Sequence, residues 1–380
     1  MFNRTFLRSA KRTYLNLKGI ISNQHAYKGP DLVQVDLTDK CKSNCCFCWL
    51  HSPFLGEDVQ RVFQDIDFTV LKCFLSDVVK SGASDIILSG GGEPFCYPDF
   101  WKVLEYAQKL RVKVHINTSL AFIGKADISK LLSFSSLSSV TVSAWGGESA
   151  IYSKLHNRDD KYFFRMKENL KYLTYLKHPR IYVKLSSIVT KLNYLGLVNL
   201  FELAVETRCD AIEFGVLDSI SEATDIFLLD LYQLDFLSKN FIKIMREMQR
   251  KNSKIKVEGK SRFLRRINNP KAFQGEYDSF IENNRCFSGW TFLRMRANGD
   301  LNSCLKSHRI PIGNIYKNSF LELWNNMLQR EFREQSLKLP KRKDYFKQIG
   351  NIQTEGIGCK RICDNLSLNS SILRMLQHIL

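Results

Sequence analysis

The sequence predicts an α/β fold: a partial (β/α)6 barrel, similar to a TIM barrel, followed by a small α+β domain with a β-hairpin. Short apolar, β-branched runs alternate with helical periodicity from about residue 29 to residue 220, which is typical of a sheet of parallel strands. Cysteines cluster in the loop after the first of these runs, and a second group surrounds a hairpin pattern near the C-terminus. With 380 residues, 44% of them hydrophobic, the chain can bury a large core and a smaller second one.

The chain begins with a predicted basic amphipathic helix over residues 1–28. Phe6, Tyr14 and Ile20 are among its apolar positions, and arginines and lysines occupy the opposite face. Such a helix either packs across one end of its own domain, which we expect here, or lies on an anionic membrane surface.

The barrel is predicted over residues 29–220. Its strands are expected at residues 33–37, 85–89, 112–117, 139–143, 181–189 and 211–215. Helices are expected between them, around residues 67–81, 98–110, 126–135, 159–177 and 194–207. In a barrel of parallel strands, the loops at the carboxyl ends of the strands form the functional site.

Three further segments complete the predicted organisation. Residues 221–284 are expected to bridge the two domains, with a long helix at about 226–250. Residues 285–365 form the second domain, in which alternating residues at 291–296 and a turn at 298–300 predict the hairpin. Residues 366–380 are expected to form a closing amphipathic helix.

The composition limits the class of protein and its partners. A net charge of +18 favours anionic partners, such as a phosphorylated or nucleotide-linked small molecule, an acidic membrane surface or nucleic acid. A solvated lysine-rich surface explains the charge equally well, and no nucleic-acid-binding motif is found. The eleven cysteines are odd in number, have metal-like spacings and follow no secretory signal, so we expect a cytoplasmic metal protein. No stretch approaches the length of a transmembrane helix.

The loop after the first strand carries Cys41, Cys45 and Cys48 with the spacing CxxxCxxC, and Phe47 precedes the last cysteine. Three thiolates on one loop can ligate three corners of a cubane iron–sulfur cluster, whereas four thiolates close it. An open metal position is where chemistry can take place. The alternatives are a zinc or closed cluster site with a fourth ligand elsewhere, or buried thiols. Cys46 lies off the spacing and is interpreted as a bystander.

A glycine-rich turn follows the second strand. Gly90, Gly91 and Gly92 permit positive φ and a close approach of the backbone to a ligand. Glu93 and Pro94 come next, and the proline restricts the preceding residue to an extended conformation. Taken alone the turn is weak support for a site, because glycines at strand ends are often only turn formers.

The two motifs, in this order, resemble those of radical S-adenosylmethionine (AdoMet) enzymes. That superfamily has the CxxxCxxC loop, an aromatic residue at the place of Phe47, and a GGEP motif one βα unit later. The resemblance implies a six-unit open barrel and a [4Fe–4S] cluster on Cys41, Cys45 and Cys48 whose open iron binds AdoMet. It also implies that the backbone at Gly91, Gly92, Glu93 and Pro94 contacts the methionyl amino group.

Other AdoMet-binding residues are implied less specifically. Ser143, at the end of the fourth strand, resembles the ribose-contacting residue, and Asn117 is a second candidate with local turn capping as its alternative. Arg158 occupies the place of a basic residue that approaches the AdoMet carboxylate, and Ile188 is placed to contact adenine. For catalysis, Glu213 and Asp218 could orient a substrate hydroxyl or accept its proton, or could be solvated strand-end charges.

The second cysteine set consists of Cys286, Cys304, Cys359 and Cys363. Four such cysteines can converge on one closed metal centre, and a zinc ribbon is one alternative. The region resembles the twitch or SPASM extensions of radical AdoMet enzymes, in which a cysteine, an NGD-like turn, a second cysteine and a GNI-W segment support auxiliary iron–sulfur clusters. With four cysteines, the resemblance implies the twitch form with one auxiliary [4Fe–4S] cluster. It covers about residues 31–365.

The resemblance implies reductive cleavage of AdoMet to a 5′-deoxyadenosyl radical, which abstracts a hydrogen atom while the auxiliary cluster accepts an electron. A flavodoxin- or ferredoxin-type protein would supply the first electron. A single auxiliary cluster resembles the arrangement in dehydrogenases of cyclitols, so we expect an oxidoreductase of a sugar, cyclitol or nucleotide-linked small molecule. The alternatives are a peptide-modifying enzyme that forms thioether or carbon–carbon crosslinks or epimerises residues, a nucleic-acid-modifying enzyme, and a non-catalytic zinc or cluster scaffold.

Overall fold

The computed structural model describes residues 4–55, 62–251, 254–278, 281–350, 359 and 361–377. Within these residues, ten strands form one sheet in the order β10-β9-β8-β1-β2-β3-β4-β5-β6-β7. The strands are β1 (Leu32–Val35), β2 (Asp85–Leu88), β3 (Lys113–Thr118), β4 (Leu137–Ser143), β5 (Tyr182–Val189), β6 (Ala211–Val216), β7 (Lys256–Glu258), β8 (Phe292–Met295), β9 (Asp300–Asn302) and β10 (Gly313–Asn314).

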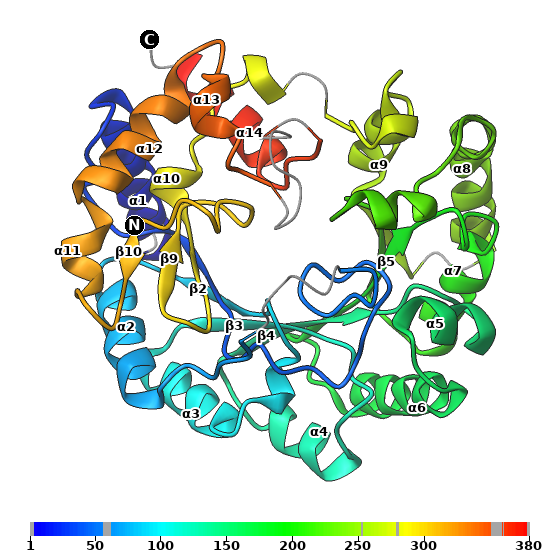
Figure 1. Ribbon diagram of the computed structural model, residues 1–380. Helices are drawn as coiled ribbons and strands as arrows, with labels where there is room; N and C mark the ends of the chain where they lie inside the picture. Colours follow the sequence, from blue (N-terminus) through cyan, green and yellow to red (C-terminus); the bar gives the residue numbers. More distant parts are fainter. Residues whose placement is uncertain are drawn as a thin grey trace.

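The strands from β1 to β7 are parallel neighbours, and helices cover their outer side in an arc (Figure 1). The helices of this part are α2 (Phe68–Lys80), α3 (Phe100–Leu110), α4 (Lys125–Leu132), α5 (Ser149–His156), α6 (Asp160–Leu176), α7 (Leu197–Glu206), α8 (Leu231–Lys251) and α9 (Lys260–Ile267). The predicted fold class, a partial barrel of βα units, is therefore confirmed. All six strands expected from the sequence are present, within about two residues of their predicted bounds.

Two predicted helices differ from the observed ones, each for a local reason. The N-terminal helix α1 (Arg4–Ile21) ends well before residue 28, because Asn23 adopts the left-handed conformation at φ 70°. Helix α8 begins at Leu231 rather than near residue 226. The carboxylate of Asp230 accepts a hydrogen bond from the backbone N–H of Gln233 at 2.9 Å, which caps the helix at that point.

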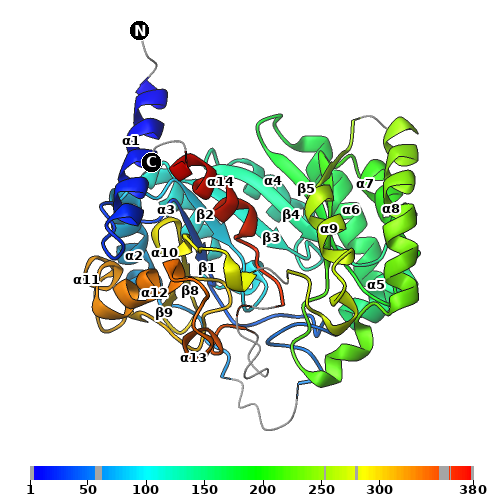
Figure 2. The same ribbon diagram turned by 90° about the horizontal axis from the view of Figure 1, so that it is seen from above.

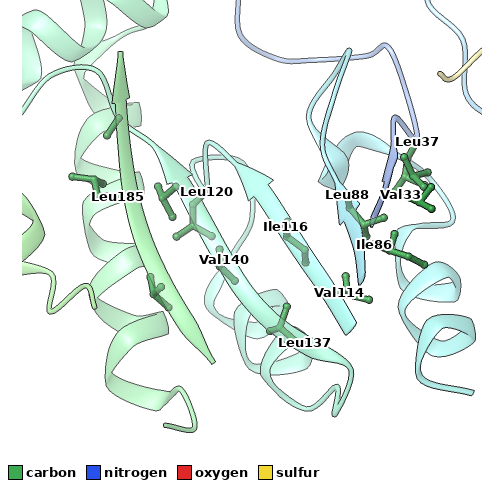
Figure 3. Close-up of a cluster of buried hydrophobic side chains, with 14 of the residues drawn as sticks. Val33, Leu37, Ile86, Leu88, Val114, Ile116, Leu120, Leu137, Val140 and Leu185 are labelled. Carbon is green, nitrogen blue, oxygen red and sulfur yellow. The ribbon is translucent and has the colours of Figure 1, made fainter. Parts of the chain in front are cut away.

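The hydrophobic core lies between the sheet and the outer helices (Figure 3). Strand β5 shows how the sequence creates it, since buried and half-buried residues alternate along its whole length. Val183, Leu185 and Val189 are fully buried, whereas Ser186 and Ile188 line a cavity inside the barrel. Because successive side chains of a strand point to opposite faces, one face of β5 builds the core and the other builds the site.

The C-terminal region continues the barrel sheet instead of forming a separate one. Strand β8 pairs parallel with β1 over four residues, from Leu32 opposite Phe292 to Val35 opposite Met295. Strand β9 returns antiparallel to β8, as the hairpin pattern predicts, and Gly299 in the turn has φ 86°. The remaining helices are α10 (Ser288–Thr291), α11 (Phe320–Trp324), α12 (Met327–Leu337), α13 (Lys343–Phe346) and α14 (Leu366–Gln377), and 3-10 turns span Pro94–Cys96, Glu222–Phe227, Ala272–Gln274 and Ile281–Asn283.

A buried ion pair joins the two regions next to the cysteine loop. Nε and Nη2 of Arg294, from β8, donate to Oδ2 of Asp36, the residue after β1, at 3.0 and 2.6 Å. Their side chains are only 5% and 1% exposed. At the other edge of the sheet, β7 pairs parallel with β6, so the segment at 221–284 contributes a strand as well as the helices α8 and α9.

The C-terminal half of α1 packs on the body of the protein, while its N-terminal half projects away from it (Figure 2). Leu17 and Ile20 are buried, and Arg12 and Asn16 donate hydrogen bonds to Asp31 at 2.7 and 2.6 Å. In the part of the chain that the structure describes, no helix combines the length and the apolar character that crossing a membrane requires.

Candidate active site

A cavity of about 500 Å³ opens at the carboxyl ends of the strands. Its walls come from the cysteine loop after β1, the glycine loop after β2, the segment after β4, strand β5, strand β6 with the segment that follows it, helix α9 and the C-terminal region. The lining residues include Cys45, Phe47, Cys48, Trp49, Gly90, Trp145, Ser186, Ile188, Glu213, Asp218, Arg262, Lys306 and Asp364. The cavity therefore lies where a barrel of parallel strands places its active site.

The three thiols of the CxxxCxxC loop are close to one another and receive hydrogen bonds. The backbone N–H groups of Ser43 and His51 donate to Sγ of Cys41 and of Cys48, each at 3.3 Å. Burial, with smaller contributions from Glu93 and Cys48, raises the pKa of the Cys41 thiol to about 12. Burial and its two neighbours likewise raise the pKa of Cys45. Since such thiols ionise only when a cation compensates their charge, the donor set suits a metal cluster.

The loop is anchored to the end of helix α5 through Cys46. Its backbone N–H donates to the Leu155 carbonyl at 3.0 Å, and its thiol donates to the Lys154 carbonyl at 3.1 Å. The ring of Phe47 stacks on Trp145 at 4.3 Å between centroids. The sequence interprets Cys46 as a bystander of the motif, and the structure shows that it anchors the loop to α5, a role that its sequence position does not reveal.

The ring of His156, the last residue of α5, lies next to the thiol of Cys45. Its Nδ1 is 3.5 Å from Sγ of Cys45, and its Nε2 accepts a hydrogen bond from the backbone N–H of Trp145 at 3.3 Å. Burial lowers the pKa of His156 to about 3, so the ring is neutral.

The glycine loop needs glycine because it packs directly on the loop that leads to Cys41. A Cβ atom on Gly91 would lie 2.3 Å from Oδ1 of Asp39, and one on Gly92 would lie 2.1 Å from the carbonyl oxygen of Lys40. The backbone N–H groups of Gly92 and Glu93 donate to the carbonyls of Thr38 and Lys40 at 2.9 and 3.0 Å. The glycines thus permit the contact between the two motifs that the sequence shows only as neighbours in order.

We therefore expect Gly92→Ala to remove the cluster of the first cysteine set. The added methyl group displaces the Lys40 carbonyl, next to Cys41, whereas the second set is untouched. Iron per chain in anaerobically reconstituted protein should fall from about eight atoms to about four. The matched control is Gly124→Ala, where the nearest atom to the new Cβ is 3.8 Å away and iron should stay complete. Full iron loading of Gly92→Ala would refute the expectation.

The carboxylate of Glu93 is held inside the protein. It accepts hydrogen bonds from Thr118 Oγ1 at 2.5 Å and from the N–H and Oγ of Ser119 at 2.9 and 2.8 Å. Burial raises the pKa of Glu93, and these hydrogen bonds oppose the rise. The side chain therefore ties the end of β3 to the glycine loop, and Pro94 begins the 3-10 turn that follows.

The other predicted AdoMet-binding residues have different positions. Ile188 lines the cavity, and Ser143 is the last residue of β4, opposite Ser186 in register. Asn117 donates to Ser89 Oγ at 3.2 Å, and the guanidinium of Arg158 lies 6.0 Å from the Tyr162 ring.

Several cavity-lining residues were not singled out from the sequence as site residues, among them Trp145, Ser186, Arg262 and Lys306. Ser186 could have been found, because it is two residues from Ile188 on the same face of β5. Trp145 lies just beyond the fourth strand, in a position that the strand end alone does not specify. Arg262 and Lys306 reach the cavity from α9 and from the loop after β9, and only the fold brings them there.

The two predicted carboxylates, Glu213 and Asp218, both line the cavity and both have cationic partners. Glu213 is paired with Lys184 and with Arg262, and Asp218 is paired with Lys306. Burial alone would lower the pKa of Lys306, but Asp218 and Asp364 outweigh it and raise that pKa, so the ammonium group stays charged.

The four thiols of the second cysteine set also converge. Burial raises the pKa of Cys304 to about 12, and the nearby thiols of Cys359 and Cys286 add to the rise. Burial also raises the pKa of Cys363, and the other three thiols add to it. Four thiolates are the usual ligands of a closed [4Fe–4S] cluster. In the described residues, no three His, Cys, Asp or Glu side chains are placed to hold a single metal ion.

Trp49 lies between the first and the second cysteine set and lines the cavity. It follows Cys48, and its ring stacks near His308, four residues after Cys304, with 6.2 Å between centroids. The guanidinium of Arg294 lies over the same ring at 4.9 Å. The cavity is thus bordered by one cysteine set on the barrel side and by residues adjoining the other on the C-terminal side.

Residues 286–348 match the family model of the SPASM domain, described as an iron–sulfur cluster-binding domain. The matched segment contains Cys286 and Cys304 and both strands of the hairpin. The match confirms the predicted similarity of the C-terminal region to SPASM extensions, a class of iron–sulfur cluster-binding domain.

Solved structures of radical AdoMet enzymes superpose on most of the chain. SuiB of Streptococcus suis bound to S-adenosylmethionine is 17% identical with a TM-score of 0.63, covering 88% of this chain and 75% of that one. SuiB bound to the precursor peptide SuiA is 19% identical with a TM-score of 0.61, covering 88% and 73%. The protein anSMEcpe with AdoMet and a Cp18Cys peptide is 14% identical with a TM-score of 0.62, covering 92% and 100%.

The superpositions show that the chain shares the fold of these proteins. At identities of 14–19% they do not identify its substrate. A search of the curated proteins finds no match.

Proposed function

We propose that this radical AdoMet protein dehydrogenates a small polar molecule, such as a sugar, a cyclitol or a nucleotide-linked compound. The observation that supports it most is the position of the cavity, which has Cys45 and Cys48 on one side and Lys306 and Asp364, neighbours of the second cysteine set, on the other. A substrate in the cavity would lie between a hydrogen-atom acceptor and an electron acceptor.

The first cysteine set would hold a [4Fe–4S] cluster and, with it, AdoMet. When bound, this pair supplies a carbon radical that takes a hydrogen atom from an unactivated carbon. The residues of the chain line the cavity in which this reaction would take place. Phe47, Trp145 and Ile188 form an apolar wall, and Ser186 offers a hydroxyl group. We propose that AdoMet lies against this wall, with the backbone of Gly91, Gly92, Glu93 and Pro94 and the side chains of Asn117, Ser143 and Arg158 as further contacts.

The opposite end of the cavity is polar and suits a substrate with several hydroxyl or anionic groups. Arg262 and Lys306 provide cationic contacts, and Glu213, Asp218 and Asp364 provide acceptors for hydroxyl groups. We propose that Asp218 accepts the proton of the substrate hydroxyl, because it lines the cavity and is held there by its pairing with Lys306. The electron of the oxidised substrate would pass to the cluster of Cys286, Cys304, Cys359 and Cys363, and a flavodoxin- or ferredoxin-type donor would reduce the first cluster. We also propose a cytoplasmic location, because a reducing compartment keeps cysteine thiols available as metal ligands.

Peptide modification is the second candidate. It is favoured by the bound peptides of two structures with the same fold, SuiA on SuiB and Cp18Cys on anSMEcpe.

The experiment is anaerobic reconstitution with iron and sulfide, followed by a strong reductant and AdoMet. Release of 5′-deoxyadenosine is measured by mass spectrometry with sugar phosphates, cyclitols, nucleotide sugars and ribosomally made peptides offered separately. Substrate-dependent release together with a product two hydrogens lighter from one of the small molecules supports the proposal. Release only with peptides favours the second candidate. A colourless zinc protein, or a cluster that never cleaves AdoMet, contradicts both.

We expect Asp218→Asn to uncouple AdoMet cleavage from product formation. The amide keeps an acceptor for Lys306 but cannot take up a proton, so product formation should fall roughly 10²- to 10⁴-fold while 5′-deoxyadenosine continues to appear. The matched control is Glu222→Gln, an exposed carboxylate four residues further along. Unchanged product formation by Asp218→Asn would remove this residue from the mechanism.

A further inference from the structure

The tautomer of His156 follows from its two neighbours. The backbone N–H of Trp145 points at Nε2 from 3.3 Å, and a backbone N–H can only donate. Nε2 is therefore an acceptor without a proton, and the ring proton is on Nδ1. Nδ1 in turn faces Sγ of Cys45 at 3.5 Å, so the N–H of His156 donates to that sulfur.

The position of this donor is fixed by packing. The His156 ring is 2% exposed and is stacked between Trp145 and Tyr152, with centroid distances of 4.3 and 4.1 Å. Trp145 also stacks on Phe47 in the cysteine loop. Because the carbonyls of Leu155 and Lys154 bind Cys46, helix α5 and the loop form one unit, and the ring has no freedom to turn away.

We propose that His156 is a positioning residue that sets the reduction potential of the first cluster by donating a hydrogen bond to Cys45. This rests on the proposed function, in that Cys45 is taken to ligate the cluster. A hydrogen bond to a ligating sulfur stabilises the more negative, reduced state and so raises the potential. Cys41 and Cys48 receive their hydrogen bonds from backbone N–H groups, whereas Cys45 receives one from a side chain that can be replaced.

The test is a redox titration of the reconstituted holoprotein, followed by electron paramagnetic resonance. His156→Phe keeps a stacking ring but has no donor, whereas His156→Asn puts an amide nitrogen near the place of Nδ1. The Phe variant should have a more negative midpoint potential for the first cluster, and its reduced fraction at a fixed potential should be several-fold lower than that of the wild type. The Asn variant should recover most of the difference. The cluster of the second cysteine set serves as an internal reference and should not shift.

If the Phe variant fails to load a cluster, a second measurement on otherwise unaltered protein decides. With ¹⁵N in the imidazole Nδ1 of histidine, the reduced first cluster should show a nitrogen hyperfine coupling. The coupling should persist in His51→Asn protein, which lacks the imidazole of the residue whose backbone N–H donates to Cys48. Equal potentials in wild type and His156→Phe, or no such coupling, overturn the inference while AdoMet cleavage stands. A wild-type protein without a cluster at this site would overturn the proposed function as well.

Discussion

Replacing Cys41, Cys45 and Cys48 together by alanine is expected to abolish AdoMet cleavage and to remove about half of the iron, roughly four atoms per chain. The three thiols are the proposed ligands from one loop, and burial together with neighbouring thiols raises the pKa of Cys41 and Cys45, so these two are not free thiolates. The second cysteine set belongs to another part of the fold and should keep its cluster.

The controls separate this loss from a general failure to load iron. Cys46→Ala changes a neighbouring cysteine whose thiol bonds a carbonyl of α5, and it should retain the iron of both sites. Alanine at Cys304, Cys359 and Cys363 should remove the other half of the iron and leave the first site loaded. Measurable 5′-deoxyadenosine release by the Cys41, Cys45 and Cys48 variant would disprove the assignment of the first site.

Arg294→Met is expected to destabilise the folded protein by about 3–5 kcal/mol. The substitution leaves Asp36, whose side chain is 1% exposed, as a buried charge without its cationic partner. Arg294 also donates to the Leu305 carbonyl and lies over Trp49, so its loss weakens the contact between β1, the cysteine loop and the C-terminal region. The measurement is anaerobic urea unfolding of the reconstituted protein, monitored both by cluster absorbance and by circular dichroism.

Two comparisons show whether the cost comes from the unpaired charge. The double variant Asp36→Asn with Arg294→Met removes both charges and should recover most of the stability. Lys239→Met breaks an exposed pair with Asp235, in which the side chains are 70% and 57% exposed, and should cost less than about 1 kcal/mol. An effect of Arg294→Met no larger than that of Lys239→Met would show that the ion pair does not hold the two regions together.

The strands and helices of the barrel could be predicted because each depends on a short-range pattern of residues. The apolar alternation of residues 181–189 predicts β5, and a left-handed residue or a side-chain cap accounts for the helix ends that differ from prediction. The cysteine spacing similarly identifies the first set, since its three cysteines lie within a stretch of eight residues. A local pattern does not specify which strands pair or in which register. The parallel pairing of β8 with β1 therefore does not follow from the sequence pattern.

The sequence by itself determined the βα alternation, the cysteine loop, the glycine-rich turn and the hairpin of the second domain. Only the tertiary structure decided which distant groups meet: Arg294 and Asp36 are 258 residues apart, His156 and Cys45 are 111 apart, and Lys306 and Asp218 are 88 apart. The physical reason is that strand and helix periodicity depends on neighbours within one or two turns, whereas these pairs depend on which distant segments the open sheet brings together. The pairing of charges in the cavity and the tautomer of His156 are therefore determined by tertiary contacts, and no sequence motif predicts them.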